Sequence, residues 1–162
     1  MNIKAAAPLA LSLLLALGAC ANKTADASAA NGSGGGAGSS QGTAPGSQDD
    51  LANNVGDKVF YATDSSSLSS DARGTLDRQA AWLGRYPQVQ VQMGGNCDER
   101  GTTEYNLALG QRRANAARDY LVARGVSSAR VTSISYGKER PTAVGSDEAA
   151  WTQNRNATTS VR

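Results

Sequence analysis

Two hydrophobic periods alternate along the last two-thirds of the chain. Between residues 88 and 93 apolar and polar residues alternate strictly, so Val89, Val91 and Met93 share one face, as in a half-buried strand. Between residues 70 and 85 apolar residues recur at helical spacing, a serine can cap the start, and Tyr86-Pro87 ends the run. Further strands are expected at 58–62, 130–136 and 157–161, and further helices at about 103–124 and 146–154.

The order of these segments indicates the fold class. Strands alternate with amphipathic helices, which favours an α/β (α+β) domain whose helices cover one face of a small sheet. Residues 51–162 hold every Tyr and Trp and the only Phe, and about 110 residues can bury one modest core. We therefore expect one folded domain over residues 51–162, with Gly125 just after the end of its longest helix.

The first twenty residues have the layout of a secretory signal peptide. Lys4 precedes an apolar run from Leu9 to Leu17, which is too short to span a bilayer. The sequence Leu-Gly-Ala-Cys that ends at Cys20 resembles the bacterial lipobox, which implies cleavage after residue 19 and acylation of Cys20. Ala21 follows, where inner-membrane lipoproteins usually have Asp, so the outer membrane is expected. The alternative is a short buried helix with an incidental cysteine.

A linker is expected between this cysteine and the folded domain. Residues 20–50 contain no aromatic or large aliphatic residue and are rich in Gly, Ser and Ala, so they cannot bury a core. A flexible coil of about 30 residues has an r.m.s. reach of roughly 30 Å and can stretch to about 100 Å. This length suits a domain that works some distance from a membrane surface.

Composition excludes several classes of function. The formal net charge is +2, which gives no reason to expect a nucleic-acid partner. The chain has no His, which excludes Ser-His-Asp and Cys-His catalysis and histidine-ligated zinc. Cys97 has no histidine or adjacent lysine to activate it, so an inert thiol is expected rather than a hydrolase nucleophile. We expect no enzyme activity, no metal and no cofactor.

The helix expected at 103–124 places a charge on its apolar side. On a helical wheel Arg113 falls within the core-facing sector, and Asn106 lies two turns upstream on the same line. Asp98 lies in the loop that leads into this helix, and Arg100 in that loop could pair with Glu99 or with another protein. An unpaired guanidinium there would be costly, so Arg113 needs an anionic partner or a wet cleft.

Two interpretations of these residues remain open. Asp98 and Arg113, held apart, would recognise a zwitterion with one ammonium and one carboxylate. Alternatively, they form an internal salt bridge, and the protein is a lipoprotein that acts only as a protein-binding scaffold.

Five ordered motifs resemble those of the peptidoglycan-associated lipoproteins of Gram-negative bacteria, which carry an OmpA-like domain and belong to the Tol-Pal system. The resemblance covers nearly all of residues 57–162. The motifs are Asn96-Cys-Asp-Glu-Arg-Gly-Thr, Glu104-Tyr-Asn, Leu109-Gly-Gln-Arg-Arg-Ala-Asn, Tyr136-Gly-Lys-Glu-Arg-Pro and Asp147-Glu-Ala-Ala-Trp-Thr-Gln-Asn-Arg.

The resemblance implies a fold, a ligand and partners. The fold is a small mixed sheet with two main helices on one face, and the ligand is meso-diaminopimelate in uncrosslinked peptidoglycan stems. Carried over by motif, Asp98 takes the ligand ammonium, Arg113 takes a carboxylate, Asn106 and Leu109 line the pocket, and Asp64 contributes from a neighbouring loop. The implied partners are peptidoglycan, TolB and other Tol-Pal proteins, with roles in envelope integrity and cell division.

Three places depart from the family pattern. Ala62 stands where the family has Asp, and Gly94-Gly95-Asn96 stands where it has Glu-Gly-His. The paired glycines are expected to loosen the loop that carries Asp98. The ending is also less apolar than usual, so Thr158 and Thr159 are expected to weaken the last strand.

Overall fold

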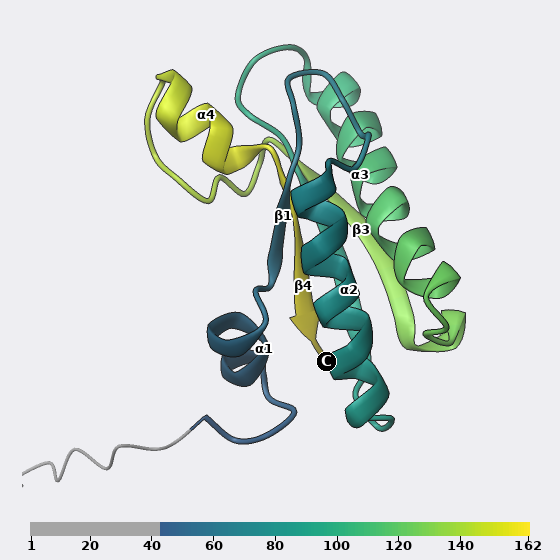
Figure 1. Cartoon of the computed structure of the whole chain (residues 1–162). Coiled ribbons are helices and arrows are strands. Elements are labelled where there is room, and N and C mark those ends of the chain that lie inside the picture. The colour runs from purple at the N-terminus through teal and green to yellow at the C-terminus, as the bar shows by residue number, and fades with distance from the viewer. Residues whose placement is uncertain (1–42) are drawn as a thin grey trace, which may run out of the picture. The chain divides into compact units, whose positions relative to one another are not determined.

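Helices and strands alternate along residues 43–162, the part of the chain that the computed structural model describes (Figure 1). The predicted signal peptide, Cys20 and most of the predicted linker lie outside these residues. Within them no helix is long and apolar enough to cross a membrane. The elements are α1 (Gln48–Asn54), β1 (Lys58–Phe60), α2 (Ser70–Arg85), β2 (Val91–Asn96), α3 (Thr103–Ala123), the 3-10 helix η1 (Ser128–Arg130), β3 (Val131–Gly137), α4 (Glu148–Asn154) and β4 (Asn156–Val161).

The strands of this region form one mixed sheet in the order β1-β4-β2-β3. β4 runs antiparallel to both of its neighbours, and β3 runs parallel to β2. Helices α2 and α3 pack against the same face of the sheet and against each other (Figure 1). The predicted fold class is therefore confirmed.

Local sequence explains where the two long helices begin and end. The hydroxyl of Ser69 accepts a hydrogen bond from the Ala72 amide at the start of α2, and Thr102 caps α3 in the same way. Gly125 has a φ of 94° just after α3, and the next amide, of Val126, donates to the Leu121 carbonyl at 3.1 Å.

The core lies between the helices and the sheet. Its largest fully buried apolar side chains are Trp82, Leu51, Leu76, Leu83, Met93, Leu121, Val59 and Val91.

The predicted linker, residues 20–50, extends too far at its C-terminal end, because the folded domain already begins before Leu51. α1 begins at Gln48, and Asp50 is buried, where it accepts a hydrogen bond from the Trp82 indole at 2.9 Å. The side-chain amide of Gln48 donates through Nε2 to the Thr159 carbonyl and accepts through Oε1 from the Val161 backbone amide. It therefore bonds to β4 beyond the end of the short β1. These polar residues fold through contacts with distant segments, which the hydrophobic pattern does not reveal.

The last strand forms in the middle of the sheet despite its threonines. β4 begins one residue before the predicted segment, and β2 begins three residues later than its predicted start at Gln88. The buried Thr159 hydroxyl donates to the Gln79 side-chain oxygen at 2.8 Å. Because this polar group is satisfied, burying it carries no large desolvation cost.

The two glycines before the Asp98 loop each allow a close packing contact. A Cβ on Gly95 would overlap the backbone carbonyl of Gly110 in α3, and a Cβ on Gly94 would overlap the Tyr136 ring. Both glycines are buried. The effect of these glycines on the Asp98 loop stays a prediction, but the structure gives them a packing role that the sequence did not suggest. Gly95 permits close contact between α3 and β2, and Gly94 makes room for the Tyr136 ring of β3.

Gly95→Ala tests this close contact. We expect the free energy of unfolding to fall by about 1–3 kcal/mol or more, because backbone must move to admit the methyl group. Urea unfolding measures the change. Gly84→Ala is the matched control, since a Cβ there meets no heavy atom within 4 Å, and it should stabilise α2 by up to about 1 kcal/mol. Equal stability of Gly95→Ala and wild type would contradict the packing described.

Candidate ligand-binding site

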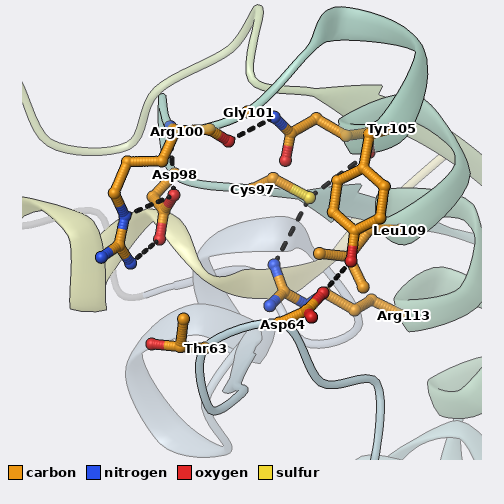
Figure 2. A pocket seen from close by; sticks show the side chains of 10 residues that line it. Thr63, Asp64, Cys97, Asp98, Arg100, Gly101, Tyr105, Leu109 and Arg113 are labelled. Atoms are coloured by element: carbon orange, nitrogen blue, oxygen red, sulfur yellow. Dashed lines mark hydrogen bonds and ion pairs between the residues drawn. The ribbon is translucent and has the colours of Figure 1, made fainter.

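A pocket of about 210 Å³ opens where the loops after β1 and β2 meet the N-terminal half of α3 (Figure 2). All five residues predicted for the site, Asp64, Asp98, Asn106, Leu109 and Arg113, line it. Sequence reasoning did not assign the remaining lining residues to the site. These are Thr63, Cys97, Arg100, Gly101 and Tyr105.

Arg113 lies at the base of the pocket with its charge almost wholly buried. Only 1% of the residue is exposed, as its position on the core-facing side of α3 predicted. Its guanidinium donates to the carbonyls of Ser65 at 2.8 Å, Asn96 at 2.9 Å and Ala62 at 3.1 Å. No carboxylate of residues 43–162 forms an ion pair with it. The alternative of an internal Asp98–Arg113 salt bridge is therefore wrong.

The buried guanidinium retains capacity to bind an anion. Burial lowers the pKa of Arg113, but arginine stays protonated in proteins. Of the five N–H groups of a guanidinium, three donate to the carbonyls and one to Cys97 Sγ at 3.4 Å. The fifth, on Nη2, has no partner among the described residues. The site thus offers an uncompensated positive charge and a free donor.

Asp98 pairs with two other arginines, on the opposite side of the pocket. Arg100 Nη2 lies 2.6 Å from Asp98 Oδ2, and Arg155 Nη1 lies 3.3 Å from the same oxygen. Figure 2 shows Asp98 and Arg100 together, apart from Arg113 and Asp64. Burial alone would raise the pKa of Asp98, but hydrogen bonds from Arg100 and Arg155 hold it below its ordinary value of 3.8.

Arg155 is a buried part of this arrangement that sequence reasoning missed. It follows α4 and also donates to Glu148 at 2.8 Å and to Thr152 at 2.9 Å. It lies 57 residues from Asp98 along the chain, and in the sequence it is marked only as the last residue of the motif that begins at Asp147. α4 also supplies Trp151, whose ring lies 4.2 Å from the Arg100 guanidinium carbon.

The remaining predicted residues shape the loop and the wall of the pocket. The Asn106 amide donates to the carbonyls of Arg100 at 2.8 Å and Thr102 at 3.1 Å, so it fixes the loop that bears Asp98. The buried Leu109 forms part of the wall. Asp64 is exposed, has a φ of 53°, and accepts a hydrogen bond from the Tyr105 hydroxyl (Figure 2). A positive φ at a non-glycine residue is uncommon and recurs at functional sites.

Comparison with known proteins identifies the family. Residues 60–155 match the OmpA family. A peptidoglycan-associated lipoprotein of Rhizobium meliloti is 54% identical over 93% of this chain and 84% of its own length. Its counterpart in Brucella melitensis is 50% identical over 96% of this chain and 92% of its own length. The chain belongs to the OmpA family and, within it, to the peptidoglycan-associated lipoproteins.

Solved structures agree with this membership. The crystal structure of the peptidoglycan-associated lipoprotein from Burkholderia pseudomallei is 42% identical, covers 70% of this chain and 100% of its own, and has a TM-score of 0.65. The C-terminal domain of Helicobacter pylori MotB has a TM-score of 0.62 over 65% of this chain and 84% of its own. At 19% identity that domain shows a shared fold alone.

Cys97 lines the pocket and is buried beneath the charged residues. The thiol is buried, and its sulfur lies 3.4 Å from the Asn106 carbonyl and from Arg113 Nη1. Burial is the main cause that raises the pKa of Cys97, and the charge of Asp98 adds to it. Both effects favour the unreactive thiol. Among residues 43–162 no group of three His, Cys, Asp or Glu side chains could hold a metal ion.

Acid unfolding tests the charge state of Asp98. Because its folded pKa lies below the unfolded value of about 4, Asp98 stabilises the fold above that pH, and this contribution is lost as pH falls through the folded pKa. We expect Asp98→Asn to lose about 1–3 kcal/mol at pH 7 and to show a weaker pH dependence between about pH 5 and pH 2, by urea unfolding. Asp119→Asn, which removes a largely exposed carboxylate, should follow the wild-type profile. Parallel profiles for Asp98→Asn and wild type would refute the assignment.

Proposed function

We propose that the protein is a lipid-anchored, non-enzymatic tether that binds peptidoglycan through this pocket and so links the outer membrane to the cell wall. The observation that carries the proposal is the buried Arg113, whose charge meets no anion among the described residues and which lines a pocket that also holds carboxylates. The names of the relatives, peptidoglycan-associated lipoproteins, support the ligand class.

The proposed ligand is meso-diaminopimelate in an uncrosslinked stem peptide. Its free end carries a carboxylate and an ammonium on one carbon, at the end of an aliphatic chain. The carboxylate binds Arg113, and the ammonium binds Asp98 on the opposite side of the pocket, while Asp64 lines the pocket on the Arg113 side (Figure 2). Leu109 contacts the methylene groups, and Asn106 keeps the Asp98 loop in place. A crosslinked stem has lost this free ammonium and so binds poorly.

The N-terminal segment supplies the anchor in this proposal. The acyl chains on Cys20 hold the protein in the outer membrane, since several chains together anchor stably where one binds only marginally. The Gly-, Ser- and Ala-rich residues 21–42 are the proposed linker, and a flexible coil of about 20 residues has an r.m.s. reach of roughly 25 Å and a stretched length of about 75 Å. TolB and other Tol-Pal proteins are the proposed protein partners, with roles in envelope integrity and outer-membrane constriction during cell division.

Thermal melting with a diaminopimelate-containing stem peptide tests the site. A ligand at one hundred times its Kd stabilises a wild-type fold by about 2.7 kcal/mol, and Arg113→Ala should lose this ligand-induced shift. The ligand-induced shift is compared within each variant, because Arg113→Ala also leaves three carbonyls without their donor. Arg112→Ala, which removes the exposed neighbouring arginine, is the matched control and should keep the full shift. A full shift in Arg113→Ala would refute the assignment of this residue.

The two cysteines provide a test of the anchor. We expect Cys20→Ser to abolish acylation and to move the protein from the outer-membrane fraction to the soluble periplasmic fraction, measured by fractionation and mass spectrometry. Cys97→Ser, which changes a buried thiol within the domain, should remain acylated and in the membrane fraction. If Cys20→Ser stayed with the membrane in cells whose peptidoglycan had been digested, the lipid anchor would be the wrong explanation.

A further inference from the structure

Both oxygens of Asp98 are fully used by groups of the protein itself. Oδ1 accepts from the Arg100 backbone amide and from Arg100 Nε, each at 3.2 Å. Oδ2 accepts from Arg100 Nη2 at 2.6 Å and from Arg155 Nη1 at 3.3 Å. A carboxylate offers about four acceptor positions, so a ligand ammonium finds none free on Asp98. One of the present donors must leave before the ammonium can bind there.

Two of these donors are fixed by other contacts. Arg155 has only 7% of its side chain exposed and is also held by Glu148, Thr152 and the Tyr61 carbonyl. The Arg100 amide belongs to the loop backbone, which the Asn106 side chain holds through the Arg100 carbonyl. Moving Arg155 would break several hydrogen bonds at once, and moving the Arg100 amide would shift the loop that Asn106 holds.

The Arg100 guanidinium can leave Asp98 at much lower cost. Its side chain is 40% exposed, and both of its side-chain hydrogen bonds go to Asp98. Water can replace these bonds for the exposed Arg100, and an incoming ammonium replaces them for Asp98, whose side chain is only 9% exposed. The Trp151 ring lies under the guanidinium at 4.2 Å and is held by its own hydrogen bond to Glu99 at 3.1 Å. The ring therefore supports Arg100 whether or not Asp98 is its partner.

We propose that Arg100 is an internal competitor for the ligand ammonium on Asp98 and thereby sets the specificity of the pocket. In the free protein its guanidinium occupies the place of the ammonium, and binding exchanges one cation for the other. A ligand without an ammonium cannot make this exchange, so it gains only the contact with Arg113. This inference rests on the proposed function, since it assumes a ligand with an ammonium in this pocket.

The test compares two ligands with the same carbon chain. Meso-diaminopimelate carries two ammonium groups, and pimelate carries none. Arg100→Gln removes the competing charge and keeps a shorter, uncharged polar side chain. We expect its Kd for diaminopimelate to fall about three- to tenfold and its Kd for pimelate to stay the same or rise. Isothermal titration calorimetry on the purified protein measures both constants.

Control variants separate this effect from a general change of charge. Arg140→Gln removes another arginine stacked on an aromatic ring, at 4.2 Å from Tyr136, and should change neither constant. Arg100→Lys keeps the charge but loses the two-point contact, so its Kd for diaminopimelate should fall less than that of Arg100→Gln. Melting curves without ligand confirm that each variant is folded.

Each other outcome has a definite meaning. Weaker diaminopimelate binding by Arg100→Gln would make Arg100 a ligand contact and overturn the competitor role. An equal gain for both ligands would also overturn it, because the ammonium would then play no part. Wild-type binding with no change in Arg100→Gln would refute the competitor alone. If neither wild type nor Arg100→Gln bound diaminopimelate, the proposed ligand and the competitor would both be wrong.

Discussion

Burial of the Arg113 guanidinium without an anion is the constraint on which the site depends. A charge taken out of water is costly unless hydrogen bonds replace its hydration, and here three carbonyls do so, from Ala62, Ser65 and Asn96. These carbonyls belong to the loop after β1 and to the end of β2, so the same contacts join both segments to α3. Carbonyl dipoles satisfy the donors but do not neutralise the charge. The interactions that stabilise this end of the domain therefore also leave it able to bind an anion.

Close packing of backbone on backbone makes that burial possible. Gly95 in β2 and Gly110 in α3 touch because neither has a side chain, and Arg113 lies one turn after Gly110. A wider spacing would move the guanidinium away from the carbonyls of the loop after β1. The departure at Ala62 leaves this arrangement intact, because that residue contacts Arg113 through its main-chain carbonyl rather than its side chain. The burial of Arg113 thus depends on backbone positions that a comparison of side chains would overlook.

Hydrophobic periodicity predicted the helices that are fixed by nearby residues, and it missed the contacts between segments far apart in the sequence. α2 and α3 carry their own caps and apolar faces, and the position of Arg113 on the inner face of α3 follows from helix geometry alone. α1 has one large apolar residue, the buried Leu51, and is also held by Gln48 and Asp50 through distant partners, so hydrophobic periodicity does not predict this helix. The Asp98–Arg155 pair likewise depends on how α4 returns to the pocket. The resemblance to a family supplied the site residues, and geometry explains why Arg113 needs no internal carboxylate.

The two charged residues of the pocket differ in how the protein satisfies them when no ligand is bound. Arg113 is held by carbonyls, so a ligand carboxylate adds a partner to it and displaces none. Asp98 is only 7% exposed, and a buried carboxylate needs donors at all times, which Arg100 and Arg155 provide. In the proposed complex an ammonium at Asp98 therefore replaces an existing interaction, and its net gain is small. The carboxylate then contributes most of the affinity, and the ammonium contributes discrimination, because a ligand that cannot replace Arg100 leaves that side of the pocket closed.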